Sequence, residues 1–149
     1  MKKAWFAAIT AGLMMSSSLC LAAVPGDAIA LGGVAPGSSV EAAKSIFGTP
    51  NYAGKKLYFP NGVIIEVYEH NPNMVEEIET WTAQGAATPG GVQVGMNESV
   101  LERTYGRPDK FEQEYNETEY TYYSTDYFRK MEFKAVNGTI VKIKCEIRG

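Results

Sequence analysis

The chain has 149 residues, which suggests one domain or two small repeats. Hydrophobic residues make up 45% of it and charged residues 21%, a composition that forms a core and is not that of a disordered protein. The 14 Lys and Arg against 17 Asp and Glu give a formal net charge of -3, which argues against nucleic-acid binding because phosphates need clustered basic charge. One histidine and two cysteines exclude a multi-His or multi-Cys metal site and leave little material for a catalytic triad.

Residues 1–23 have the pattern of a cleaved secretory signal peptide. Two lysines precede an apolar run, 4–15, and small residues follow that run. The run is about a dozen residues long, short of the roughly 20 that a membrane-spanning helix needs, so we expect no transmembrane segment after signal removal. Cleavage is expected after Ala22 or Ala23, with the bond after Ala30 as a further candidate.

Cys20 raises the question of a lipid anchor. Leu19 precedes it, whereas a lipoprotein signal has a small residue at that position, so we assign Cys20 to the removed segment. The mature chain then has a single cysteine, Cys145, and no internal disulfide. The removed segment carries two lysines and no acids, which leaves 12 minus 17, or -5. We expect an exported protein of a bacterial envelope, periplasmic or extracellular, without a lipid anchor.

One pattern occurs twice along the rest of the chain. Residues 32–50 and 90–108 share it at an offset of 58 positions, which predicts a first repeat over 24–81, a linker over 82–89 and a second repeat over 90–149. The identical pairs are Gly32/Gly90, Gly33/Gly91, Val34/Val92, Gly37/Gly95, Gly48/Gly106 and Pro50/Pro108.

Each repeat is predicted to open with a short helix, near 39–47 and near 98–105. Ser38 with Glu41 fits a capping box at the first helix, and Asn97 is the expected cap of the second. Helices of two turns are unstable alone, so each is expected to pack on a sheet. The residues predicted for their buried faces are Val40, Ala43, Ile46 and Phe47, and then Val100, Leu101 and Tyr105.

Three strands are predicted to follow each helix, and the fold class is α+β with two tandem helix-strand-strand-strand repeats whose short helices pack on antiparallel sheet. Asn-Gly between apolar runs indicates tight hairpins, and we read Asn71–Asn73 as a further turn. In the last strand Val141, Ile143 and Cys145 share one face. Whether the two repeats share one sheet is open. The predicted strands are 55–59, 63–69, 74–82, 118–124, 128–136 and 139–147.

The stretch from Gly95-Met96-Asn97 through Val100 to Gly106-Arg107-Pro108 resembles the opening motif of the SmpA/OmlA (BamE-like) small envelope proteins. It is also similar to the repeat unit of the secreted β-lactamase inhibitor proteins, which carry two such units side by side. The resemblance extends over residues 32–147. It implies short helices on one face of an antiparallel sheet, with the other face free for a protein partner, and it implies no specific target.

Tyrosine is unusually abundant: the chain has nine, and five of them lie within thirteen positions. Protein interfaces favour tyrosine because it supplies a large contact area with few rotatable bonds. Ordinary cross-strand packing is the alternative, since tyrosine also favours strands. Tyr120 and Tyr122 would share one strand face while Tyr123 points to the other. The candidate partner-binding residues are Tyr58, Tyr68, Trp81, Tyr120, Tyr122, Tyr123 and Tyr127.

A group of acidic residues surrounds those tyrosines and could steer a basic partner or hold a weak cation. We favour a solvated acidic loop, since the spacing is not that of a calcium loop. His70 is interpreted as a surface residue because no nucleophile or second ligand is near it in the sequence, and Cys145 as a small buried hydrophobe. The acids are Asp109, Glu112, Glu114, Glu117 and Glu119.

Together these features predict a non-catalytic protein-binding module, of envelope-assembly or enzyme-inhibitor type. The alternative is a small-ligand or cell-wall-fragment binding protein that uses the exposed tyrosine-rich sheet face. We expect no enzyme activity, no cofactor, no metal and no nucleic acid. The partner is expected to be another protein, and the sequence specifies neither its identity nor the oligomeric state.

Overall fold

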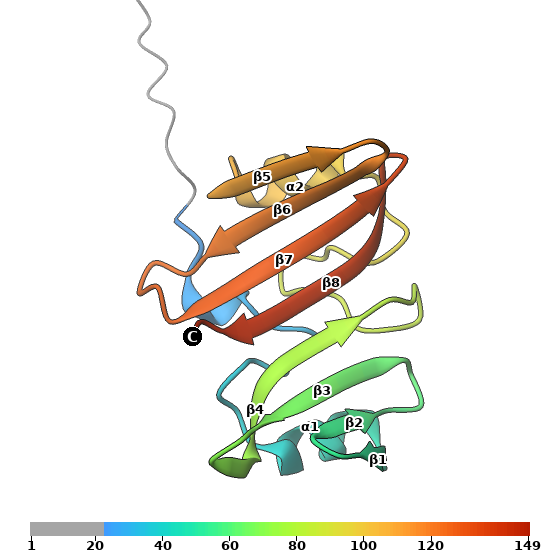
Figure 1. The fold of residues 1–149 in the computed structure, drawn as a ribbon, viewed down its shortest axis with the longest axis vertical. Coiled ribbons are helices and arrows are strands. Elements are labelled where there is room, and N and C mark those ends of the chain that lie inside the picture. Colours follow the sequence, from blue (N-terminus) through green and yellow to red (C-terminus); the bar gives the residue numbers. More distant parts are fainter. Residues whose placement is uncertain (1–22) are drawn as a thin grey trace, which may run out of the picture.

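The computed structural model describes residues 23–149, so the predicted signal segment and Cys20 lie outside the described residues. Within that range eight strands form one antiparallel sheet and two short α-helices lie on one of its faces, which confirms the α+β class (Figure 1). A single 3-10 turn, Gly26–Ala28, precedes them. The elements are α1 (Val40–Phe47), β1 (Asn51–Ala53), β2 (Lys56–Tyr58), β3 (Val63–Tyr68), β4 (Asn71–Thr80), α2 (Ser99–Tyr105), β5 (Lys110–Glu114), β6 (Glu117–Tyr123), β7 (Arg129–Val136) and β8 (Thr139–Ile147).

The strand order is β1-β2-β3-β4-β8-β7-β6-β5. Each half of the chain contributes one helix and four consecutive strands, and the halves meet where β4 pairs with β8. The two halves therefore share one sheet, which the sequence had left open. The last strand of each half lies at the centre of the sheet, and β1 and β5 lie at its edges (Figure 1).

Both helices lie close to their predicted positions, but the first cap is displaced by one residue. Ser39 has an extended backbone and its Oγ accepts a hydrogen bond from the Ala42 amide, 3.1 Å away. Ser38 instead donates to the Ala35 carbonyl, so the predicted capping box with Glu41 is wrong. Asn97 does take part at the second helix, where its Oδ1 accepts from the Ser99 amide at 2.9 Å.

The two short strands at the sheet edges were missed by the sequence prediction. Every residue of β1 and β5 is exposed, so neither strand shows the alternation of apolar residues that predicts a half-buried strand. The predicted turn at Asn71–Asn73 is also wrong, because these residues begin β4 and the chain reverses at Glu69–His70. Pro72 lies where the β3–β4 register is irregular, a place in a sheet that tolerates a missing amide hydrogen.

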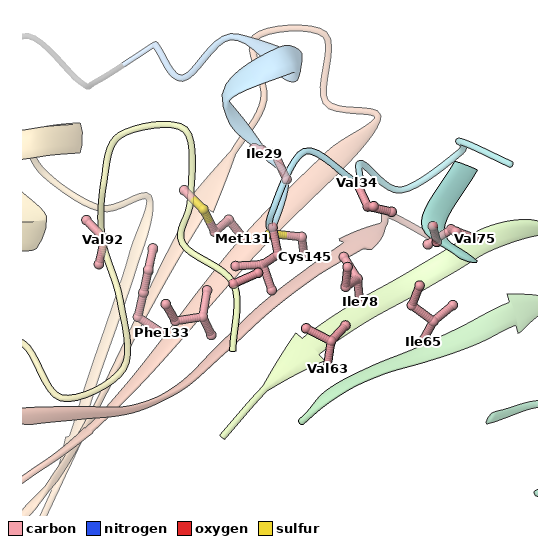
Figure 2. Close-up of a cluster of buried hydrophobic side chains, with 14 of the residues drawn as sticks. Ile29, Val34, Val63, Ile65, Val75, Ile78, Val92, Met131, Phe133 and Cys145 are labelled. Atoms are coloured by element: carbon pink, nitrogen blue, oxygen red, sulfur yellow. The ribbon is translucent and has the colours of Figure 1, made fainter. Parts of the chain in front are cut away.

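The core lies between the sheet and the helices. Figure 2 shows Val63, Ile65 and Ile78 of one half near Met131 and Cys145 of the other, with Ile29 and Val34 of the N-terminal segment among them. The N-terminal segment is thus part of the fold. The predicted linker also packs onto it, since Ala86 and Thr88 are buried and the Gly32 amide donates to the Ala87 carbonyl.

The last strand departs from simple alternation. A register shift in the β7–β8 pairing aligns Ala135 with Ile140 and Lys134 with Lys142. Ile140 is therefore buried with Ile143 and Cys145, whereas Val141 is only half-buried, which corrects the predicted face. Of the helices formed by residues 23–149, none is long and apolar enough to cross a bilayer.

Candidate functional site

The sheet has one face that none of the described elements covers, and we call it the open face (Figure 1). The helices, the N-terminal segment and residues 83–97 all contribute to the opposite side, where the core lies. Because side chains alternate along a strand, the strands between the two edges send their buried residues to the core and the residues between these to the open face. The open face carries mainly lysine and glutamate: Lys56, Glu66, Glu77, Glu79, Glu117, Glu119, Lys130, Glu132, Lys134, Lys142, Lys144 and Glu146.

These charges form a connected ion-pair network centred on Lys144. Its Nζ lies 2.8 Å from a Glu132 oxygen, 3.2 Å from Glu146 and 3.8 Å from Glu77. Lys130 lies 2.6 Å from Glu146 and 2.9 Å from Glu132. Burial acts to lower the pKa of Lys144, but the hydrogen bond to Glu132 and the surrounding carboxylates outweigh it and raise the pKa. The network was not predictable from spacing, because its members lie on three strands from both halves.

Two carboxylates of this network face each other directly. Glu77 on β4 is aligned with Glu146 on β8. Burial, followed by a hydrogen bond with Glu146, raises the pKa of Glu77 to about 7. Glu146 stays ionised because Lys130 and Lys144 flank it and lower its pKa against the opposing effect of burial. Protonation of Glu77 therefore relieves the repulsion between the two opposed carboxylates at the centre of the open face.

Trp81, which follows β4, is the aromatic residue beside this network. The residue is 48% exposed, and its Nε1 donates to Glu79 Oε1 at 3.3 Å. Lys142 Nζ lies 4.8 Å from the ring centroid and 2.9 Å from Glu79 Oε2. A shallow hollow of about 150 Å³ adjoins the ring. Its walls are Trp81, Glu119, Thr121, Glu132, Phe133, Lys134, Lys142 and Lys144.

The structure separates the predicted tyrosines into two groups. Tyr120 and Tyr122 are buried, and Tyr122 donates its hydroxyl to the Gly106 carbonyl at 3.1 Å. They point to the helices because the inner face of β6 packs against α2, so they belong to the core side of the sheet and add no contact area to its other face. Tyr58 and Tyr127 are exposed.

Tyr123 and Tyr127 form a small cationic and aromatic cluster near the end of β6. The Arg148 guanidinium lies 4.3 Å from the Tyr123 ring centroid and 5.5 Å from that of Tyr127. Tyr58 and Tyr68 lie on β2 and β3, in the other half of the sheet. The exposed aromatic residues therefore occupy separate places, with Trp81 after the central strand β4, and do not form one continuous patch.

The predicted acidic loop is a hairpin of two strands. Glu112 is aligned with Glu119 and Glu114 with Glu117, so four carboxylates share the open face at the sheet edge. Within residues 23–149, no group of three His, Cys, Asp or Glu side chains is placed to hold a metal ion. His70 is exposed in the β3–β4 turn, and its ring centroid lies 5.8 Å from that of Tyr68. Cys145 is buried.

No protein-family model matches the chain, and no curated protein matches it. Among solved structures, the fold is similar to that of YjgB, a DUF4309 family protein from Bacillus subtilis, with a TM-score of 0.51 and 15% identity over 74% of this chain and 79% of that one. An extracellular protein containing an SCP domain from Bacillus anthracis has a TM-score of 0.46 and 10% identity, over 75% of this chain and 44% of that one. At 15% identity, the likeness to YjgB shows the fold alone.

Proposed function

We propose that this chain is an exported, non-catalytic protein-binding module that meets its partner through the open face. The observation that carries the proposal is a sheet whose helices all lie on one side, leaving the other side with exposed aromatic residues around charged strands. Trp81 and Tyr58 supply exposed ring area on that side, and Tyr127 adds to it from the β6–β7 loop, where its ring lies beside that of Tyr123. Exposed aromatic side chains bounded by charged groups are typical of protein interfaces.

We further propose that the two halves are copies of one repeat. Equivalent backbone contacts support this: the Gly37 amide donates to Val75 and the Gly95 amide to Ile140, both at 2.7 Å. Both helices also end on a glycine of positive φ, Gly48 and Gly106, whose amides donate to the carbonyl four residues earlier. An arrangement of this kind fits the resemblance to the BamE-like and β-lactamase inhibitor proteins.

The partner is proposed to be either a component of envelope assembly or an enzyme whose surface the open face covers. Both settings lie outside the cytoplasm and agree with the N-terminal signal pattern, with the chain in the periplasm or in the medium. The proposal assigns no chemical role to Cys145, which is buried, or to His70, which is exposed in the β3–β4 turn beside Tyr68.

A small-ligand function is the second candidate, and the hollow beside Trp81 is the observation that favours it. In this hollow the Trp81 ring would stack on a cell-wall sugar, and Lys142 and Glu132 would make polar contacts with it. The volume of about 150 Å³ is small for a ligand pocket, since those are usually about 300 Å³ or more. We therefore rank a protein partner first.

The test is capture of binding partners from the source organism's envelope and medium, with mass spectrometry of the retained proteins. The chain is compared with a Trp81→Ala/Tyr127→Ala variant and with Tyr115→Ala, a matched control whose ring is 97% exposed at the β5–β6 turn. We expect one protein to be retained by the chain and by the control and lost from the double variant. Equal retention by all three would contradict the proposal, and retention of cell-wall fragments alone would favour the second candidate.

A further inference from the structure

The sheet has one edge that is long enough to accept another strand. β5 has five residues, all exposed, and lies at the end of the strand order (Figure 1). The opposite edge, β1, has only three residues. Unpaired edge strands offer rows of free backbone donors and acceptors, and very short edges are poor templates for pairing.

The register of the hairpin identifies the free backbone groups. The two-residue turn Tyr115–Asn116 closes on the aligned pair Glu114 and Glu117. Two-residue hairpin turns close on a hydrogen-bonded pair, and such pairs alternate along an antiparallel ladder. The amide and carbonyl groups of Phe111 and Gln113 therefore point away from β6, toward solvent.

On the helix side, this edge borders a groove with an apolar floor. Phe111 is 54% exposed and packs edge-on against Tyr120, with 5.2 Å between ring centroids. Glu98 also borders this groove, where it lies beside the Tyr120 hydroxyl and its Oε2 is buried. The groove has a volume of about 610 Å³ and is bounded by Asn97, Glu98, Ser99, Glu102, Arg103, Phe111 and Tyr120.

On the open face, the same edge is acidic. Glu112 faces Glu119 and Glu114 faces Glu117, and like charges directly opposite one another destabilise a sheet. Only Glu117 of these has an ion-pair partner among the described residues, with Lys134 Nζ at 2.6 Å. The four carboxylates and Gln113 surround a hollow of about 370 Å³. Positive charge from a partner would remove this repulsion.

We propose that β5 is a docking edge for an extended, basic segment of a partner protein, which adds to the sheet as a further strand. Its backbone bonds to Phe111 and Gln113, so its side chains alternate between the two faces. Those on one side meet Glu112 and Glu114, and those on the other pack on Phe111 and reach Glu98. The edge is a separate surface from Trp81 and its hollow, and it extends the proposed function by a second contact.

The charge around β5 favours a basic partner over a second copy of this chain. Around β5, six carboxylates face three basic side chains, so two copies placed edge to edge would bring like charge together. A segment with lysine or arginine at every second position instead matches the spacing of the open-face carboxylates. The acids are Glu98, Glu102, Glu112, Glu114, Glu117 and Glu119, and the bases are Arg103, Lys110 and Lys134.

The probe is an acetylated, amidated heptapeptide of alternating lysine and valine, carrying a fluorophore, titrated with the purified chain by fluorescence anisotropy. The key variant is Gln113→Pro, which removes an outward amide hydrogen at an edge position that proline tolerates and leaves the β5–β6 ladder intact. Gln113→Ala retains that amide and is the matched control. Circular dichroism verifies that both variants are folded.

We expect the chain and Gln113→Ala to bind the peptide with equal affinity, and Gln113→Pro to bind it at least about tenfold more weakly. Replacing both Glu112 and Glu114 with Gln should weaken binding at low salt by about fivefold or more, while Glu41→Gln on α1 leaves it unchanged. A peptide with glutamate in place of lysine should not bind. Equal binding by Gln113→Pro, or by the glutamate peptide, would overturn the proposal.

Two further results would also overturn the proposal that β5 is a docking edge for a basic segment. Absence of binding at millimolar lysine-valine peptide would mean that the charges of β5 only protect the edge from pairing. A dimer of the chain that dissociates in Gln113→Pro, measured by analytical ultracentrifugation, would assign the edge to a second copy. Neither result affects the open-face proposal, which depends on Trp81 and Tyr127.

Discussion

Replacing Glu77 with Gln should stabilise the protein above neutral pH. Glu77 lies directly opposite Glu146, and its pKa rises from an ordinary value of 4.5 to about 7 because burial and the hydrogen bond with Glu146 favour the protonated form. Gln has nearly the same shape, cannot ionise, and can donate the same hydrogen bond to Glu146. The variant therefore resembles the protonated wild-type residue at every pH.

Proton linkage gives the direction in which the free energy of unfolding changes with pH. Between pH 4.5 and about 7 the folded chain holds a proton on Glu77 that the unfolded chain has released, so wild-type stability falls as the pH rises through this range. A rise from 4.5 to about 7 corresponds to roughly 3–4 kcal/mol at most. Solvent screening around a side chain that is partly exposed reduces the expected gain to about 1–2 kcal/mol.

The assay is urea unfolding of the wild type and Glu77→Gln at pH 4.5 and at pH 8. We expect equal free energies of unfolding at pH 4.5 and a more stable variant at pH 8. The matched control is Glu112→Gln, the same substitution at an exposed position of the open face, which should change stability by less than about 0.5 kcal/mol at both pH values. A variant that is less stable than the wild type at pH 8 would refute the raised pKa of Glu77.

The remaining predictions concern the ion-pair network, the N-terminal segment and the buried cysteine. Lys144→Met should destabilise the chain by about 2 kcal/mol at pH 8 and by less at pH 5, where the carboxylates it leaves unpaired can take up protons, as urea unfolding would show. Ile29→Ala should lower the free energy of unfolding by about 3 kcal/mol because Ile29 is fully buried. For the same reason, intact mass should show that the secreted product begins at Ala23 or Val24. A start at Leu31 would remove Ile29 and contradict the described core. Burial raises the pKa of the Cys145 thiol, so in a Cys20→Ser chain it should react with Ellman's reagent only on unfolding, and fast reaction of the native protein would disprove its burial.

Local sequence signals predicted the helices and the tight turns well. Glycine at positions 48 and 106 ends both helices, and Asn61–Gly62 and Asn137–Gly138 both lie in turns between paired strands, as expected. These signals work because glycine and asparagine tolerate backbone conformations that other residues avoid. The strands β1 and β5 were missed, since exposed edge strands lack the apolar alternation that marks a half-buried one.

The candidate site was less predictable, because it depends on which strands are neighbours. Alternation places Tyr120 and Tyr122 on one face of a strand, but it does not say which face the helices cover, and the structure places both in the core. The pairing of β4 with β8 brings Glu77 against Glu146, which are 69 positions apart in the sequence. No local pattern encodes such a contact.

The central claim is that the open face binds the partner, and Trp81 allows it to be tested directly. The chain has two tryptophans, Trp5 and Trp81, and Trp5 lies in the predicted signal segment; Trp5→Phe makes Trp81, on the open face, the single tryptophan whether or not that segment is removed. The measurement is a titration of this variant with the captured partner, with emission and iodide quenching recorded throughout. If the account is correct, saturation shifts Trp81 emission to shorter wavelength and protects it from iodide. Tight binding that leaves both the emission and the quenching of Trp81 unchanged would contradict it.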